Sequence, residues 1–177
     1  MAEDRPPKYE ARSAGGHFDR AVALQQRTVA ISTRVLGEDH PDTLSARETL
    51  ASANRAAGEL GQAILLCAQV LEDRLRVLGE DHPDTVNARS NLALVHAERG
   101  DPDTAIPLFE QPLATSVRTL GEDHPHIPSA RLNLASAYQA TGNPGRAVPL
   151  FEQALTAYVR TLGEDHFRSL NALHGLA

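Results

Sequence analysis

The chain has 177 residues, of which 41% are hydrophobic and 4% are aromatic. Its 17 basic and 23 acidic residues give a formal net charge of −6, which disfavours nucleic acid as a partner because phosphate binding needs a basic face. The longest apolar run, residues 63–68, is far below the roughly 20 residues that span a membrane. Since no secretory signal is visible at the N-terminus either, we expect a cytoplasmic protein that does not bind membranes.

A single five-residue string recurs along the chain. Leu-Gly-Glu-Asp-His begins at residues 36, 78, 120 and 162, so that each copy starts 42 residues after the one before it. Repetition at one fixed period indicates a stack of similar supersecondary units, each of which contacts mainly its neighbours.

The chain begins with a segment that carries no apolar stripe. Residues 1–16 include Pro6 and Pro7, and we expect them to form a flexible leader. Residues 17–37 have the apolar spacing of the second helix of a unit without the first, which predicts a half repeat.

Each complete unit contains two amphipathic helices, here called helix A and helix B, and residues 80–121 show them best. Apolar residues recur at helical spacing until Gly100 ends helix A. Asp101 then supplies an N-cap and Pro102 the first helical residue of helix B, whose apolar stripe includes Phe109. The sequence therefore predicts a series of helical hairpins.

The period also predicts where the units lie. The array as a whole is expected to span residues 17–177, with full repeats at residues 38–79, 80–121 and 122–163 and a truncated helix A at residues 164–177. Pro112 falls inside a helix B, where it removes a hydrogen bond at a cost of about 3 kcal/mol and is expected to kink the helix.

The Glu-Asp-His strings place a carboxylate beside a histidine, a combination that can bind metal ions. Adjacent residues rarely close around one ion, and copies 42 residues apart lie in successive units, so we expect no metal site. The preferred interpretation is that Asp39, Asp81 and Asp123 cap the helices that follow, with the histidines filling the joints between helices.

No arrangement of catalytic residues stands out. The sequence has no Gly-rich phosphate loop, no paired-cysteine motif and no nucleophile elbow, and its other histidines and carboxylates are scattered. We therefore expect no enzymatic activity and no cofactor. The single cysteine, Cys67, lies among apolar residues and is expected to be a buried structural thiol.

The helical hairpins resemble tetratricopeptide repeats, specifically the 42-residue type of kinesin light chains. In the third full unit the family pattern is met by Leu134, Ala135, Tyr138, Gly142, Ala147, Phe151 and Ala154. The second unit matches with Leu92, Ala93, His96, Gly100, Ala105, Phe109 and Pro112. The resemblance implies an all-α solenoid of antiparallel helix pairs, wound into a right-handed superhelix, that serves as a protein–protein interaction scaffold.

The resemblance also implies that the A helices line a concave groove that binds a peptide or a protein. Together with the arginine ladder described next, the predicted groove residues are Glu48, Thr49, Ser52, Arg55, Asn87, Ser90, Asn91, Leu94, Leu132, Asn133, Ser136 and Gln139. Asn91 and Asn133 match the family position whose amide commonly holds a ligand backbone. The alternative is that these asparagines contact only water.

Arg47, Arg89 and Arg131 occupy the same place in three consecutive A helices. Such a ladder suits a partner with acidic side chains or a C-terminal carboxylate. The alternative is that each arginine pairs with a carboxylate of a neighbouring helix, and the sequence offers Glu72, Glu110 and Glu152 for this role.

Three functions follow from these features. The leading hypothesis is an adaptor that binds a partner in the groove. The second is a structural element that self-associates through the truncated C-terminal repeat, since an uncovered terminal helix attracts other chains. The third is a fragment of the sensor arm of a large signalling ATPase, in which similar 42-residue units occur, although this chain contains no P-loop.

Overall fold

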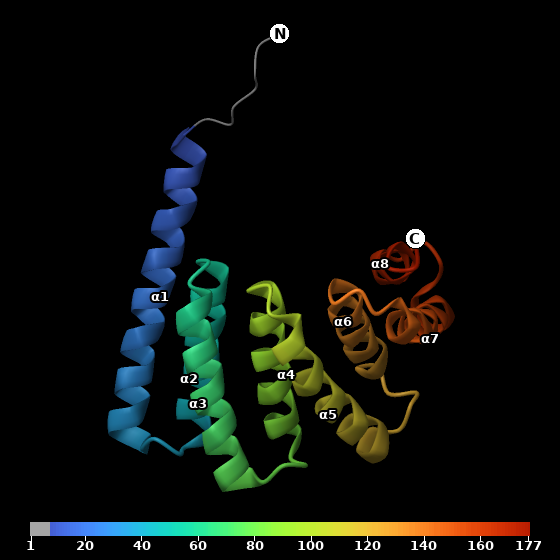
Figure 1. Ribbon diagram of the computed structural model, residues 1–177. Coiled ribbons are helices and arrows are strands. Elements are labelled where there is room, and N and C mark those ends of the chain that lie inside the picture. Colours follow the sequence, from blue (N-terminus) through green and yellow to red (C-terminus); the bar gives the residue numbers. More distant parts are fainter. Residues whose placement is uncertain (1–7) are drawn as a thin grey trace. The chain divides into compact units, whose positions relative to one another are not determined.

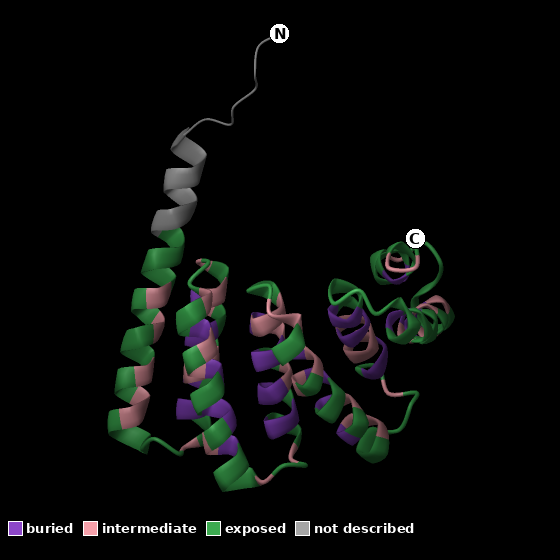
Figure 2. Cartoon of the chain, in the orientation of Figure 1, coloured by how far each residue is buried: buried purple, intermediate pink, exposed green. Residues whose placement is uncertain are grey.

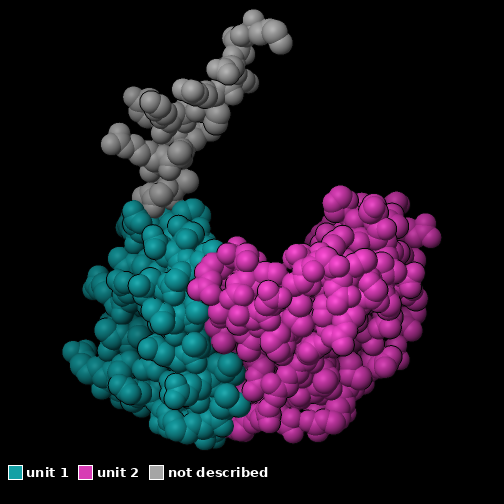
Figure 3. Space-filling view, in the orientation of Figure 1, with its two compact units in different colours: residues 1–77 teal, residues 78–177 magenta. Residues whose placement is uncertain are grey.

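The computed structural model describes the backbone of residues 8–177 and the side chains of residues 17–177. This part of the chain consists of eight α-helices and contains no strand (Figure 1). The chain divides into two compact units, Met1–Val77 and Leu78–Ala177 (Figure 3). The all-α repeat fold implied by the family resemblance is confirmed.

The first unit contains three helices, α1 (Lys8–Leu36), α2 (Pro41–Ala56) and α3 (Leu60–Leu78), the last of which ends at the first residue of the second unit. Helix α1 begins nine residues before the half repeat expected from the sequence, inside the segment interpreted as a leader. An apolar stripe indicates which face of a helix packs against the core. Residues 8–12 are mostly strong helix formers, which favour a helix even where no such stripe is present. Residues 1–7 of that leader lie outside the described residues.

The second unit contains the remaining five helices. In chain order they are α4 (Pro83–Glu98), α5 (Pro102–Leu120), α6 (Ile127–Ala140), α7 (Pro144–Leu162) and α8 (Phe167–His174). The hairpin partners are α4 with α5 and α6 with α7, and α8 packs on α7. Helix α5 continues through the buried Pro112, so the hydrogen bond lost there does not end the helix.

Two glycines illustrate why the helices end where they do. Gly100, between α4 and α5, has φ of 80°, and Gly121, after α5, has φ of 84°. Side chains with a Cβ atom are strained at such angles, so glycine turns the chain at low cost. The same geometry recurs one period away on either side, which keeps the hairpins alike.

The N-caps differ from those expected at the Gly-Glu-Asp-His loops. Nδ1 of His40 accepts a hydrogen bond from the amide of Asp42 at 3.2 Å, and His82 caps α4 in the same way. Proline occupies the first helical position in both helices, so the cap is the histidine directly before it rather than the aspartate. The predicted aspartate caps are therefore wrong, whereas the predicted cap at Asp101 is confirmed by its bond from the Thr104 amide.

The buried core residues are mainly alanine, leucine and valine with a few aromatic side chains. Figure 2 shows where buried positions lie along the helices. In the second unit Phe109, Leu134, Tyr138 and Phe151 are joined by several alanines. In the first unit Cys67 is 6% exposed. Burial raises the pKa of its thiol to about 11, with a smaller contribution from the charge of Glu48, so the predicted buried thiol is confirmed.

Candidate functional site

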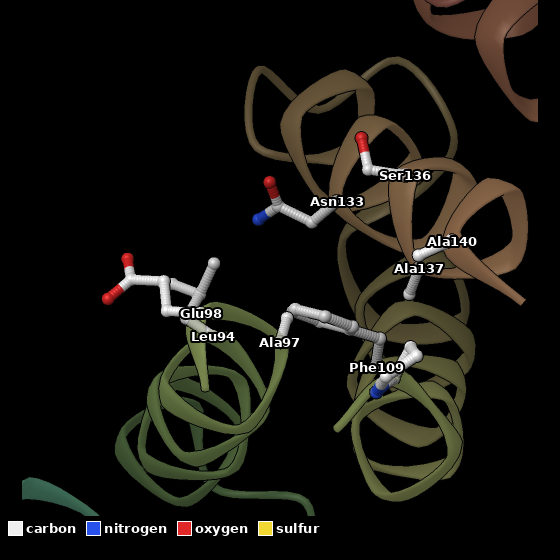
Figure 4. A pocket seen from close by; sticks show the side chains of 9 residues that line it. Leu94, Ala97, Glu98, Phe109, Asn133, Ser136, Ala137 and Ala140 are labelled. Atoms are coloured by element: carbon white, nitrogen blue, oxygen red, sulfur yellow. The ribbon is translucent and has the colours of Figure 1, made fainter. Parts of the chain in front are cut away.

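Two adjoining cavities lie between α4 and α6 in the second unit, over α5. The first, of about 280 Å³, is lined by Asn87, Ser90 and Asn91 of α4 and by Asn133 of α6. The second, of about 290 Å³, is lined by Leu94 of α4 and by Asn133 and Ser136 of α6 (Figure 4). These six residues were all predicted to line the groove, and the structure brings them to one surface, here called the α4/α6 cleft.

The α4/α6 cleft combines apolar walls with amide groups. The ring of Phe109 from α5 borders both cavities, as does Asn133. Ala97, Ala137 and Ala140 add small apolar surfaces to the second cavity (Figure 4). Small side chains allow a ligand backbone to come close to the helices, and apolar walls favour a bound side chain.

The two central asparagines keep their amides available. Asn91 is exposed and Asn133 is half-buried, and within the described part of the chain neither amide has a hydrogen-bond partner. By contrast, the hydroxyls of Ser90 and Ser136 each donate to a backbone carbonyl one helical turn earlier, at 3.0 Å. The cleft therefore offers its amides, which can both donate and accept, to a ligand.

The predicted residues of α2 are engaged within the first unit. Glu48 binds Arg74 of α3 through two bonds, at 2.7 and 2.9 Å, and this arginine side chain is only 7% exposed. The hydroxyl of Thr49 donates to the carbonyl of Ser45. Ser52 is exposed and Arg55 is half-buried. In this helix the predicted acidic groove residue thus links α2 to α3.

The arginine ladder is paired inside the protein. Arg47 binds Asp73 at 2.9 Å, Arg89 lies 3.5 Å from Glu80, and Arg131 lies 3.4 Å from Glu122, with arginine side chains 9–16% exposed. The partners expected from the sequence, Glu72, Glu110 and Glu152, were wrong. In the second unit the partner comes from the loop before helix A, nine residues upstream in both cases.

The ladder and the cleft also lie on different surfaces. Arg131 lines a separate cavity together with Gln153 and Thr156 of α7. Residues two apart on a helix point about 200° away from each other, so Arg131 and Asn133 face opposite sides of α6. Of the remaining predicted residues, Leu132 packs against the core, and Gln139 donates to the carbonyl of Gly175 at 3.3 Å.

Sequence reasoning missed a second set of ion pairs that follows the repeat. Each links the aspartate of a Gly-Glu-Asp-His loop to an arginine near the end of helix B in the same repeat, 37 residues later: Asp39–Arg76 at 2.5 Å, Asp81–Arg118 at 2.5 Å and Asp123–Arg160 at 2.6 Å. The hydrogen bond from Arg76 lowers the pKa of Asp39. Both members recur every 42 residues in the sequence, and that shared period is the signal that predicts the pairing.

Other ionisable groups in the described residues serve local structure. The pKa of Asp101 is lowered to about 2 by hydrogen bonds from Thr104 and His96 at the start of α5. Burial and the neighbouring Glu110 raise the pKa of Tyr138, whose hydroxyl contacts that carboxylate and Arg146. No cluster of histidine, cysteine and carboxylate side chains in this part of the chain has the arrangement of a metal site. Nor does any helix described here have the length and apolarity that crossing a bilayer demands.

Comparison with known proteins identifies the family. Sequence profiles of the tetratricopeptide repeat match residues 11–74, 62–115 and 129–168. A kinesin light chain-like protein of Podosopora anserina with nearly identical TPR-like repeats shares 32% sequence identity, with a TM-score of 0.78 over 95% of this chain and 81% of that chain.

More distant structures show the same fold. BtubC (BKLC) of P. vanneervenii is 17% identical, with a TM-score of 0.76 over 94% of this chain and 69% of that one. The N-terminal domain of stress-induced protein-1 of C. elegans is 16% identical, with a TM-score of 0.55 over 77% of this chain and 96% of that one. No curated protein sequence matches. The chain belongs to the tetratricopeptide repeat family and is of the kinesin-light-chain-like type, a fold of protein-interaction scaffolds.

Proposed function

We propose that the α4/α6 cleft binds an extended segment of a partner protein. The observation that carries this proposal is the pair of unpartnered amides, Asn91 and Asn133, beside cavities that share the ring of Phe109. An asparagine amide matches the alternating donors and acceptors of a peptide backbone, and an apolar pocket next to it selects a side chain. The partner is thus recognised by its backbone and one apolar residue.

The charge of the site bears on the kind of partner. Arg47, Arg89 and Arg131 are neutralised by Asp73, Glu80 and Glu122 and are largely covered. We therefore assign them a structural role, and the proposal does not require the acidic partner that the ladder suggested. Glu48 is assigned to the hairpin for the same reason.

The test uses a random peptide library displayed on phage and selected on the 177-residue chain. Selected peptides are synthesised, and their affinities are measured by fluorescence anisotropy for the wild type and for Asn91→Ala/Asn133→Ala. Because each amide can form two backbone hydrogen bonds worth about 1 kcal/mol each, loss of two or more such bonds should weaken binding roughly 30-fold or more.

Asn143→Ala is the matched control. Asn143 is exposed, makes no side-chain capping bond and lies outside the lining of both cavities. The Asn143→Ala variant should bind the selected peptides with the same affinity as the wild type. Peptides that bind the double variant as tightly as the wild type would place the site elsewhere, and a selection that yields no binder would argue against an extended peptide ligand.

A second proposed function is self-association through the C-terminal helix. In α8 the side chains of Phe167, Leu170 and Leu173 are 67%, 52% and 53% exposed. Three uncovered apolar residues on an eight-residue helix favour contact with another chain. A rise in weight-average mass with concentration in sedimentation equilibrium supports this function, and a constant monomer mass refutes it.

A further inference from the structure

Helix α1 occupies the position of a helix B but lacks the burial of one. Subtracting one period from Ala63, Cys67 and Leu71 of α3, which are 0–8% exposed, gives Ala21, Gln25 and Val29 of α1. None of these three is buried, and no residue of α1 from 17 to 36 is buried (Figure 2). The face of α1 that corresponds to the core face of α3 is therefore open.

Helix α8 occupies the position of a helix A, and it also has an open face. Leu170 corresponds to Leu44 and Val86, which are 2% and 9% exposed, and it is itself 52% exposed. By contrast, Ser169 is 1% exposed and Ala172 is fully buried. Thus α8 is packed on one side only, and the side that is covered in α2 and α4 is open.

The repeated aspartate–arginine ion pair indicates how the open faces of α1 and α8 could be matched. In every complete hairpin the loop aspartate binds the arginine 37 residues later. One period before Arg76 lies Arg34 on α1, and one period after Asp123 lies Asp165 in the loop before α8. Both side chains are exposed, and neither has an ion-pair partner among the described residues. Within the described residues, they are the two members of the series without an aspartate or arginine at the matching position.

We propose that α8 of one copy packs against α1 of a second copy as helix A and helix B of a composite repeat, with Asp165 of the first copy bound to Arg34 of the second. The occupant of both open faces is thus this chain itself. Because Glu48 pairs with Arg74 across the antiparallel α2 and α3, Leu170 then lies against the last turn of α1, near Val35 and Leu36. The inference rests on the second proposed function and specifies its contact surfaces and register.

The symmetry of such a contact determines the kind of assembly. The two surfaces differ, so the contact is heterologous, and each added copy leaves one open α1 and one open α8. The assembly therefore adds copies head to tail, as an open series or as a closed ring, depending on the rotation between neighbouring copies. Because the terminal pair is exposed, its contribution is modest and salt-sensitive, and it acts mainly by selecting the register.

A charge-exchange experiment tests the register. Sedimentation equilibrium of the full chain at concentrations up to about 1 mM populates even weak contacts. Arg34→Asp and Asp165→Arg each place like charges together and should weaken association about tenfold. The double variant Arg34→Asp/Asp165→Arg restores opposite charges and should associate within about twofold of the wild type.

Arg27→Asp is the matched control. Arg27 is an exposed arginine of the same helix, one that the composite repeat does not pair, so its reversal should leave association unchanged. Circular dichroism verifies that each variant keeps the wild-type helix content. If the single variants associate as strongly as the wild type, or if the double variant does not regain association, the proposed register is wrong. The chain then still self-associates, but through another contact. A wild type that is monomeric throughout overturns both.

Discussion

The ion pair between Glu48 and Arg74 allows a test of whether a predicted groove residue is structural or binds a ligand. The two side chains join α2 to α3 through two bonds, with 24% of the Glu48 side chain and 7% of the Arg74 side chain exposed. The same two positions hold Ser90 and Ser116 in the next repeat. The protein itself thus contains an uncharged pair of residues at the equivalent positions of another hairpin.

The third repeat supplies the best replacement. There the equivalent residues are Leu132 and Tyr158, and the tyrosine is 4% exposed. Glu48→Leu alone removes the carboxylate and keeps the covered guanidinium of Arg74. Breaking a fully buried pair costs about 3–5 kcal/mol, and partial exposure of Glu48 reduces this to about 2–3 kcal/mol. For a chain of this length the Tm should fall by roughly 4–12 °C.

The double variant Glu48→Leu/Arg74→Tyr should recover most of this loss. Replacing a buried ion pair by apolar residues of suitable shape is often neutral or stabilising, and the third repeat shows that this combination fits the fold. Thermal and urea denaturation followed by circular dichroism measure both variants. Asp39→Asn is the control, because it breaks an exposed pair and should change the Tm much less.

Two outcomes would refute this reasoning. If Glu48→Leu is as stable as the wild type, the pair does not hold the hairpin together. If that variant keeps its stability but loses affinity for selected peptides, Glu48 contacts the ligand, and the original groove prediction for α2 is restored.

The structure makes two further predictions. A Cβ atom at Gly175 would lie 2.3 Å from a ring carbon of Phe151, so Gly175→Ala should destabilise the chain by about 1–3 kcal/mol in urea denaturation. Gly145→Ala, with no atom closer than 4.0 Å to the new Cβ, should be neutral or stabilising, and equal effects of the two variants would contradict the packing. Because the pKa of Cys67 is raised from 9.0 to about 11, its alkylation by iodoacetamide at pH 8 should be about 100-fold slower in the native chain than in urea. Comparable rates in the two conditions would show that the thiol is accessible and ionised.

The period predicted the fold because it carries several independent signals at once. Gly100 marks the end of α4, and Asp101 with Pro102 marks the start of α5, so the turn was predicted from both sides. The caps at His40 and His82 were missed because histidine is an unusual capping residue and an aspartate stands beside it. The proline at the first helical position was the decisive clue, since it assigns the cap to the residue before it.

The candidate site was predictable only where helical position alone decides which way a side chain points. Asn91 and Asn133 are one period apart on α4 and α6, and both line the same cavity. The partners of the arginines depend instead on how far two long side chains reach across the surface. Arg89 binds Glu80 in the preceding loop. The sequence alone does not identify this partner, because several carboxylates lie at similar separations along the chain.

The loop-to-helix ion pairs have a consequence for how such a protein changes in evolution. Duplication or deletion of one 42-residue module adds or removes a complete aspartate–arginine pair, so no orphaned charge is left in the interior of the array. Variants of different length therefore keep the same balance of charge between the loops and the ends of the B helices.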